Sequence, residues 1–319
     1  FRWSATTNCK NGSGKKYSAM HRFIFGILFL GIVFSISLPA SARRKKDKLP
    51  EKSKEAVFME TYFPETPCRE WNKGRRFIYL DEALSPLLQP QTITATDSSY
   101  RGKVFVYEGM AEASPWRTGT VNLHFVCEGK SYYFRTGKSR EEIAGSSYTP
   151  LLPMLVAEDD IYRARMLLVG KTLYTRPATW VDSVGNTLSN RRYCEVKIID
   201  IQPGNSIYPI AFVFHDTSAA TYRIFGSLTQ TSRLQAATFE RLFTFDNPRL
   251  AYDEIPDEHW QLITCGRVAA GMTKEECRLS LGSPQNAREI PTYSGLKEEW
   301  FYRTGAYLYF EDGKLSRYR

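Results

Sequence analysis

The stretch Gly271-Met272-Thr273-Lys274-Glu275-Glu276-Cys277, followed by Leu281-Gly282-Ser283-Pro284, contains signals for both ends of one helix. Thr273 and Glu276 have the spacing of a capping box, in which the hydroxyl accepts from a first-turn amide and the carboxylate accepts from the amide of the capping residue. We therefore expect a helix that begins at Lys274. Gly282 supplies a left-handed stop, and Pro284 prevents the helix from continuing.

The residues on either side of this helix complete a small α+β unit. Upstream, Asp257 can cap a second helix that runs to about Ala269 and is weakened by Gly266. Downstream of Pro291 the apolar pattern has period two, which is typical of strands. The inward positions of that pattern are Trp300, Tyr302, Leu308 and Phe310. Asp312-Gly313 fits a hairpin turn, so we expect two helices packed on a small antiparallel sheet.

This tail, residues 257–319, resembles the SmpA/OmlA (BamE-like) domain of bacterial envelope proteins. The positions that carry the resemblance are Gly271, Met272, Thr273, Glu276, Gly282, Pro284, Trp300 and Gly313. The sequence departs from the family pattern at Cys277, where an aliphatic residue is usual, and at Ser280, where a leucine is usual. The resemblance implies a binding or assembly module whose partners are other envelope proteins, including components that assemble the outer membrane.

The amino-terminal part has the pattern of an export signal. Residues 1–19 are polar and lack an initiating methionine, so we expect them to be non-native upstream sequence. Residues 20–42 then combine a short basic start, an apolar run and an Ala-Ser-Ala end, which is typical of a cleaved signal peptide. The apolar run, of about sixteen residues, is shorter than the roughly twenty that span a bilayer. We expect a protein that is periplasmic or secreted after cleavage.

A basic segment follows the cleavage site. Residues 43–56 begin with Arg43-Arg44-Lys45-Lys46, and we expect them to form a disordered leader that can make peripheral contact with anionic lipid or glycan. Positive charge directly after an apolar segment tends to stay in the cytoplasm, so an inner-membrane anchor that is not cleaved remains the alternative.

Composition places limits on the class of partner. The chain has 43 Lys and Arg residues against 34 Asp and Glu residues, and five of the basic residues precede residue 43. The remaining 38 basic and 34 acidic residues give a net charge of +4, which does not support nucleic-acid binding. The chain is rich in Tyr and Phe, with 19 of each, and Val, Ile and Thr mark most central segments. The body should therefore be mainly β.

The central region contains two segments that look alike, which we assign to β-rich units 57–160 and 161–250. Gly102-Lys103 and Gly170-Lys171 each begin a strand-like run, and the two pairs lie 68 residues apart. Each run is followed by a tryptophan and then by a Cys-Glu pair, namely Trp116 with Cys127-Glu128 and Trp180 with Cys194-Glu195. A duplicated, SH3-like β unit is the interpretation we test, and two unrelated strands with similar starts are the alternative. The expected fold class is mainly β with an α+β tail.

Local patterns predict further elements in this region. Asp159-Asp160 precede apolar residues at helical spacing, which predicts a helix that connects the two units. The pair Ser139 and Glu142 fits a capping box for a short helix. Tyr208–Phe214 and Thr221–Leu228 are expected to pair as strands around a turn at Asp216-Thr217-Ser218.

No pattern in the chain indicates a catalytic residue, a cofactor or a metal ligand. His124 and Cys127 are three apart on a predicted strand, so their side chains should point to opposite faces. The chain lacks the Gly-x-Ser-x-Gly and His-Glu-x-x-His patterns and a phosphate-binding glycine loop. The cysteine spacing shows no Cys-x-x-Cys pair. A hydrolase with dispersed residues is the remaining enzyme hypothesis.

Two features of the tail are candidates for a specific role. In an oxidising envelope, Cys265 and Cys277 can bridge the two helices, and two buried thiols are the alternative. On the sheet, Tyr307 and Tyr309 point away from the predicted core, so they form a possible contact surface or a packed domain interface. The leading functional hypothesis is a non-enzymatic envelope protein that acts through protein contacts. A cell-wall or glycan-binding SH3-like protein is the second hypothesis.

Overall fold

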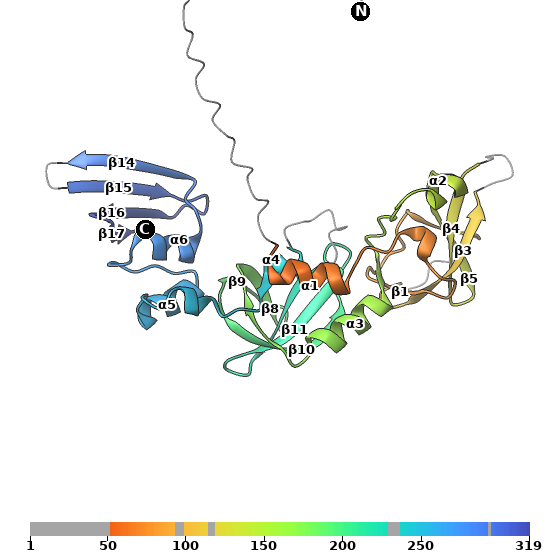
Figure 1. Ribbon diagram of the computed structural model, residues 1–319, viewed down its shortest axis with the longest axis horizontal. Coiled ribbons are helices and arrows are strands. Elements are labelled where there is room, and N and C mark those ends of the chain that lie inside the picture. The colour runs from red at the N-terminus through yellow and green to blue at the C-terminus, as the bar shows by residue number, and fades with distance from the viewer. Residues whose placement is uncertain (1–51, 93–98, 114–118, 229–236, 293–294) are drawn as a thin grey trace, which may run out of the picture. The chain divides into compact units, whose positions relative to one another are not determined.

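The computed structural model describes residues 52–92, 99–113, 119–228, 237–292 and 295–319, which form three antiparallel sheets and several short helices (Figure 1). The expected fold class, mainly β with an α+β tail, is confirmed. The predicted signal peptide, residues 20–42, and most of the predicted leader lie outside the described residues, as do residues 1–19. In the part of the chain that is described, no helix is long and apolar enough to cross a membrane.

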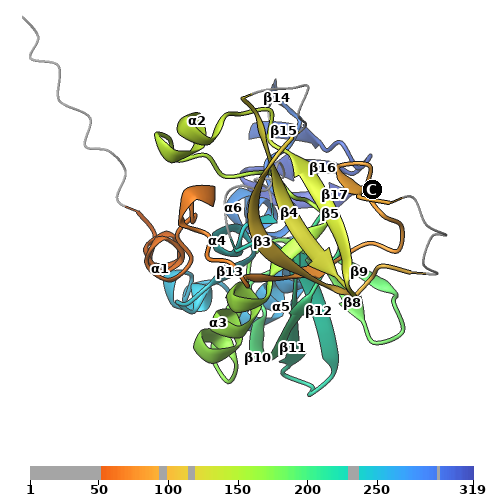
Figure 2. The same cartoon turned by 90° about the vertical axis from the view of Figure 1, so that its right-hand side faces the viewer.

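The first unit is a six-stranded sheet with the order β2-β5-β4-β3-β1-β6. Its strands are β1 (Arg76–Tyr79), β2 (Leu88–Pro90), β3 (Val104–Glu112), β4 (Val121–Cys127), β5 (Lys130–Arg135) and β6 (Leu155–Ala157). Figure 2 shows β3, β4 and β5 side by side as strongly curved strands. The short helices of this unit are η1 (Cys68–Glu70) and α2 (Arg140–Ala144). Ser139 and Glu142 form the predicted capping box of α2.

The second unit is a seven-stranded sheet with the order β13-β7-β10-β11-β12-β8-β9. Its strands are β7 (Thr172–Thr175), β8 (Ala178–Asp182), β9 (Thr187–Arg191), β10 (Glu195–Pro203), β11 (Ile210–Asp216), β12 (Thr221–Gly226) and β13 (Phe243–Thr244). Helix α4 (Phe239–Leu242) precedes β13. The predicted pairing around residues 216–218 is confirmed, because β11 and β12 are antiparallel neighbours. The connecting helix α3 (Glu158–Leu168) is also confirmed, and it buries Ile161, Ala164 and Leu168 in the core of this unit.

The two sheets have the same connectivity, which a duplication of one β unit requires. In each sheet the first strand lies between the last strand and a three-stranded meander, and the strand or hairpin that follows the first strand lies beyond the meander. Strand β1 corresponds to β7, and the meander β3-β4-β5 corresponds to β10-β11-β12. The last strands, β6 and β13, also correspond, as do β2 and the hairpin β8-β9. Each unit also places a short helix, α2 or α4, before its last strand.

The sequence matches that suggested duplication are nevertheless not equivalent positions. Lys103 precedes β3, the start of the first meander, whereas Lys171 precedes β7, the first strand of the second unit. Likewise Cys127 ends β4, whereas Cys194 lies just before β10; Trp180 lies in β8, and Trp116 is outside the described residues. The expectation that Lys103 corresponds to Lys171 is therefore wrong, although the two sheets have the same connectivity.

The Gly-Lys segments look alike because both form the same turn. Gly102 and Gly170 have φ values of 81° and 84°, which favour glycine. The amide of Lys103 donates to the carbonyl of Tyr100, and the amide of Lys171 donates to the carbonyl of Leu168, each at 3.0 Å. A local turn requirement, and not a shared position in the fold, therefore explains the match.

The first helix, α1 (Lys54–Tyr62), begins inside the segment expected to be a disordered leader. The boundary at residue 56 is wrong because Ser53 caps the helix, accepting from the amide of Ala56 at 3.1 Å. Phe58 and Met59 of α1 pack against the core of the second unit, and Phe63 is part of it. The leader can therefore include residues up to about 52 only.

The tail contains η3 (Pro248–Ala251), α5 (Asp257–Thr264), α6 (Lys274–Leu281) and a meander of β14 (Asn286–Thr292), β15 (Gly295–Phe301), β16 (Tyr307–Glu311) and β17 (Lys314–Tyr318). The start of α6 at Lys274, its reciprocal capping box and its end at Gly282 are all confirmed. The turn at Asp312-Gly313 is also confirmed, with φ values of 48° and 82°. Inward-facing residues of the sheet pack with both helices in one core.

Three details of the tail differ from the prediction. Asp257 is the first residue of α5 and does not cap it, since the flanking residue is Pro256. The helix ends at Thr264 and not near Ala269, because Gly266 adopts φ 66° and reverses the chain. Strand β14 starts before Pro291; its side chains are mostly exposed, so it has no inward apolar pattern to detect.

Candidate binding site

A cavity of about 780 Å³ lies beside the first unit. Its walls are mainly apolar and include the aromatic and proline residues Trp71, Phe77, Phe134, Tyr148, Pro150 and Pro153. Leu87 and Ile207 also line it, and their side chains are 47% and 57% exposed. A concave surface with an exposed apolar rim is the usual form of a ligand or protein contact site.

Arg75 is brought into this cavity by a tight turn at the start of β1. Gly74 has φ 90°, and the amide of Arg75 donates to the carbonyl of Asn72 at 3.1 Å. Two backbone hydrogen bonds of 2.8 Å then join this turn to Tyr107 in β3. The position of Arg75 is therefore set by the sheet itself, which makes it suitable for a specific contact.

The guanidinium group of Arg75 lies over two adjacent aromatic rings. Its central carbon lies 5.2 Å from the ring centroid of Trp71 and 5.3 Å from that of Phe77. The side chain is only 15% exposed, and Nη2 lies 3.6 Å from a carboxylate oxygen of Asp159. Its Nε is buried without a hydrogen-bond partner in the described part of the chain. An arginine in this state gains from any acceptor that a ligand or a small shift brings to it.

Asp160, in the first turn of α3, faces the same cavity. Burial raises the pKa of this carboxyl group, and the neighbouring Asp159 raises it further, whereas Arg75 and Arg163 act in the opposite direction. Nη1 of Arg163 lies 3.6 Å from Oδ1 of Asp160. Arg75, Trp71 and Asp160 also line an adjoining cavity of about 650 Å³, which is bordered mainly by charged residues. The site therefore combines an apolar cavity with a polar extension around Arg75.

The charged residues that line the two cavities are carboxylates, arginines and one lysine. No His or Cys residue is among those that line either cavity. Over the ranges that the structure describes, no group of three or more His, Cys, Asp and Glu residues is arranged to hold a metal ion. His124 stacks on Tyr133 with ring centroids 4.9 Å apart and contacts Ser131, while Cys127 is buried on the other face of β4, as expected.

The motif residues of the tail have structural positions. Trp300 and Met272 are fully buried, and the indole Nε1 of Trp300 donates to Glu298 at 3.1 Å. Glu276, besides accepting from the amide of Thr273, lies 3.1 Å from Nδ1 of His259. Pro284 follows the end of α6 directly. These residues therefore maintain the helix-sheet unit and do not form a site among themselves.

The bridge expected between Cys265 and Cys277 is absent, because both residues are free thiols. Since α5 ends at Thr264, Cys265 turns toward the second unit, where Nη1 of Arg191 lies 3.2 Å from its sulfur. Cys277 instead lies on α6 in the tail core with no exposed surface. The early end of α5 thus directs the two thiols toward different surroundings.

Tyr307 and Tyr309 lie on the outer face of the tail sheet, as expected, but their rings are partly covered. The guanidinium of Arg319 lies 4.6 Å from the ring centroid of Tyr307, and that of Arg317 lies 4.5 Å from that of Tyr309. Phe301 packs beside Tyr307 at 4.8 Å. The predicted contact surface is therefore aromatic and cationic.

Sequence reasoning missed the cavity residues. Trp71 and Arg75 lie in a loop before a four-residue strand, where no periodic pattern identifies them. For Asp160, the sequence predicts only a place at the start of a helix. The one available signal was the Asn72-Lys73-Gly74 turn, which places an aromatic and a basic residue on either side of a reversal.

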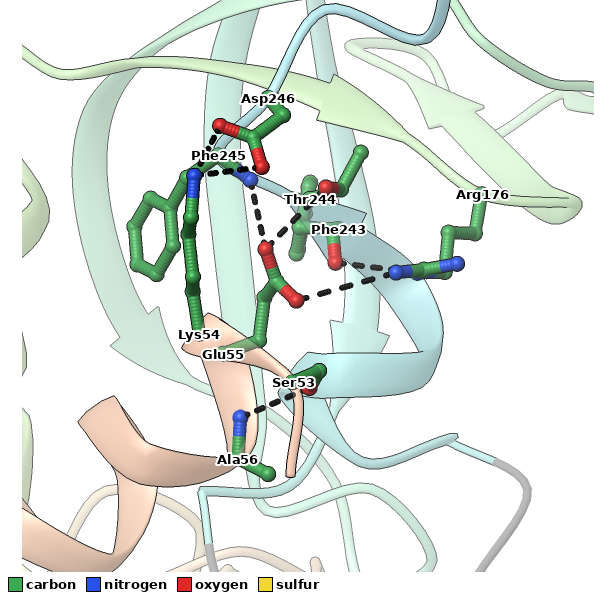
Figure 3. Close-up of polar contacts among 9 residues, drawn as sticks. All are labelled: Ser53, Lys54, Glu55, Ala56, Arg176, Phe243, Thr244, Phe245 and Asp246. Atoms are coloured by element: carbon green, nitrogen blue, oxygen red, sulfur yellow. Dashed lines mark hydrogen bonds and ion pairs between the residues drawn. The ribbon is translucent and has the colours of Figure 1, made fainter. Parts of the chain in front are cut away.

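An unexpected buried carboxylate fastens α1 to the second unit (Figure 3). Glu55 is 3% exposed and accepts from the Thr244 hydroxyl at 3.1 Å and from the Phe245 amide at 2.9 Å. Arg176 lies 3.8 Å from its other oxygen. Lys54 pairs with Asp246 at 2.7 Å on the exposed side of the same helix. This cluster fixes α1, which directly precedes the first cavity residues, Pro64 to Thr66.

Comparison of the chain with protein-family models, with curated proteins and with solved structures found no match.

Proposed function

We propose that this protein is a non-enzymatic binding protein of the bacterial cell envelope, exported by its amino-terminal signal, whose first SH3-like unit binds an extended segment of another envelope protein. The observation that carries the proposal is the mainly apolar cavity whose lining includes aromatic and proline residues together with Arg75, which lies over Trp71. Extended segments suit such a cavity because apolar side chains fill it while backbone carbonyls accept from the arginine.

The compartment and the kind of partner are part of the same proposal. The signal-peptide pattern of residues 20–42 supports export to the periplasm or secretion, with an uncleaved inner-membrane anchor as the alternative. The resemblance of residues 257–319 to the BamE-like domain supports envelope proteins as partners, including outer-membrane assembly components. The exposed apolar rim of the cavity, Leu87 and Ile207, supports protein contact over a small soluble ligand.

A glycan is the second candidate occupant. Sugar rings stack on aromatic side chains, and Trp71, Phe77 and Tyr148 all line the cavity. Cell-wall material would then use the same residues as a protein segment would. A protein segment should form a crosslinked adduct, whereas a glycan should be detected by sedimentation with cell-wall material. The same cavity variants can therefore be used in both assays.

Site-specific photo-crosslinking in bacterial cells tests the proposal. Leu87, on the rim, is replaced by p-benzoylphenylalanine, and Val184, which is 85% exposed in the β8–β9 turn, receives the same residue as a control. We expect a discrete protein adduct from position 87 that position 184 does not form. Arg75→Gln and Trp71→Ala, combined with the position 87 probe, should remove the adduct.

Melting curves of these variants show whether they remain folded, and Arg75→Gln is the milder of the two changes. If positions 87 and 184 give the same adducts, the proposed protein contact is wrong. Sedimentation of the full chain with purified peptidoglycan tests the second candidate: loss of co-sedimentation in Arg75→Gln, without any protein adduct, would favour the glycan.

A further inference from the structure

The outer face of the tail sheet is organised in rows that run across the four strands. The register places Phe301 opposite Tyr307, whose backbone in turn exchanges both hydrogen bonds with Arg319. In the next row, Tyr309 lies opposite Glu299 on one side and Arg317 on the other. Neighbours in a row are close enough for their side chains to interact. The residues of this face are therefore held in a fixed pattern.

The two arginines of these rows are held by the tyrosines but keep their polar edges available. The guanidinium carbon of Arg319 lies 4.6 Å from the ring centroid of Tyr307, and that of Arg317 lies 4.5 Å from the ring centroid of Tyr309. Both side chains are exposed, and within the described ranges neither guanidinium has a hydrogen bond or an ion pair. Stacking limits their freedom, so less entropy is lost when they bind a planar acceptor.

The charge of the face favours an anionic partner. Five basic and two acidic side chains occupy it, giving a net charge of +3, and they are Arg288, Lys297, Lys314, Arg317, Arg319, Glu299 and Glu311. Tyr307 and Tyr309, which carry the stacked arginines, are two residues apart on β16, so the guanidinium groups repeat at about 7 Å along the strand. Carboxylates on alternate residues of an extended chain have the same repeat.

We propose that this face docks an acidic, extended segment of a partner protein, with carboxylates two residues apart bound by Arg317 and Arg319. Glu299 and Glu311 lie among the basic residues of this face, so they favour a peptide over a continuous anionic surface. A membrane or a nucleic acid would bring negative charge against both glutamates, whereas a peptide can place neutral residues there. The surface is separate from the cavity of the first unit, so this inference does not depend on the function proposed above.

Fluorescence anisotropy with the full exported chain tests the proposal. The probe is a labelled peptide of alternating Glu and Val residues, and its matched control has Gln in place of every Glu. We expect the Glu peptide alone to bind, with affinity that falls as salt is raised. The double variant Arg317→Gln, Arg319→Gln should weaken binding at least tenfold. Arg317→Lys with Arg319→Lys, which keeps the charge and loses the two-pronged contact, should weaken it about threefold.

The control variant is Arg267→Gln, which removes an exposed arginine elsewhere in the tail and should leave peptide binding unchanged. Binding of the Gln peptide as tightly as the Glu peptide, or an equal loss in Arg267→Gln, would overturn the proposal. Vesicles of phosphatidylcholine and phosphatidylglycerol form a second probe: binding to these vesicles through Arg317 and Arg319, without peptide binding, would also overturn it.

Discussion

At the scale of single residues, Cys277 shows how burial changes the chemistry of a side chain. It lies on α6 in the core of the tail and has no exposed surface in the structure. Burial raises the pKa of its thiol to about 12, and the charge of Glu276 adds to this effect. Because the thiolate is the reactive form, this cysteine should behave as a small apolar residue at neutral pH.

The absence of the predicted bridge leads to a direct chemical test. We expect Cys265 and Cys277 to be alkylated fully by iodoacetamide when the protein is denatured without reductant, because both are free thiols. In the folded protein, Cys277 should be protected, since it is buried and its pKa is raised. Peptide mass mapping measures both states. Protection of both cysteines after denaturation would instead support the disulfide hypothesis.

The same pKa shift predicts a dependence of stability on alkaline pH. Below its ordinary value of 9.0, the Cys277 thiol is protonated in the folded and the unfolded protein alike. Between pH 9.0 and about 12, only the unfolded form ionises freely, so stability falls as pH rises through this window. We expect the melting temperature of Cys277→Ala to fall less steeply across the window than that of the wild type. Parallel curves for the two proteins would contradict the expectation.

At the scale of elements, the attachment of α1 depends on Glu55. Its carboxylate accepts from the Phe245 amide and the Thr244 hydroxyl, so its removal leaves buried donors without partners. We expect Glu55→Ala to lower the free energy of unfolding by about 2 to 3 kcal/mol. Urea denaturation measures the change.

The neighbouring residue provides the control for this prediction. Lys54→Ala breaks an ion pair whose two side chains are 70% and 66% exposed, so the urea midpoint should hardly move. Equal effects of the two substitutions would show that α1 is held by surface charge and not by the buried carboxylate. The pair of variants thus separates two contacts on adjacent residues of one helix.

The end of α5 gives a second test at this scale. Gly266 and Gly271 both have positive φ, at 66° and 94°, but their surroundings differ. A Cβ at Gly266 would lie 2.5 Å from the Cβ of Asn190, whereas one at Gly271 meets nothing within 4 Å. The backbone cost of alanine is about 1 to 2 kcal/mol at either position.

We therefore expect Gly266→Ala to be the more destabilising of the two, by at least about 1 kcal/mol, because the clash with Asn190 adds to the backbone cost. Gly271→Ala serves as the matched control for left-handed geometry alone. Thermal unfolding of the two variants measures the difference. The same loss of stability in both would mean that the contact between α5 and the β9 end relaxes at little cost.

At the scale of the whole molecule, the amino-terminal pattern predicts export and cleavage. We expect protein recovered from the envelope to begin at Arg43, because the apolar run of residues 20–42 ends in Ala-Ser-Ala. Amino-terminal sequencing gives the answer, and replacement of Ala42 by a bulky residue should block cleavage. Recovery of an intact apolar segment in the membrane fraction would support the inner-membrane anchor.

Elements with local signals were predictable from the sequence. The capping box of α6, its Gly282 stop, the buried face of α3 and the pairing of β11 with β12 all depend on residues close together in the chain, and all are confirmed. The outward direction of Tyr307 and Tyr309 was predictable for the same reason, since a strand alternates strictly between two faces.

The order of the strands in each sheet depends on tertiary packing. Lys103 and Lys171 share a turn but occupy different places in their sheets, because strand order is set by long-range packing that no short motif records. The same limit applies to the sites: Arg75, Trp71 and Asp160 come together only when β1, its preceding loop and α3 assemble. The early end of α5 likewise separated Cys265 from Cys277, since the left-handed turn at Gly266 directs Cys265 toward the second unit.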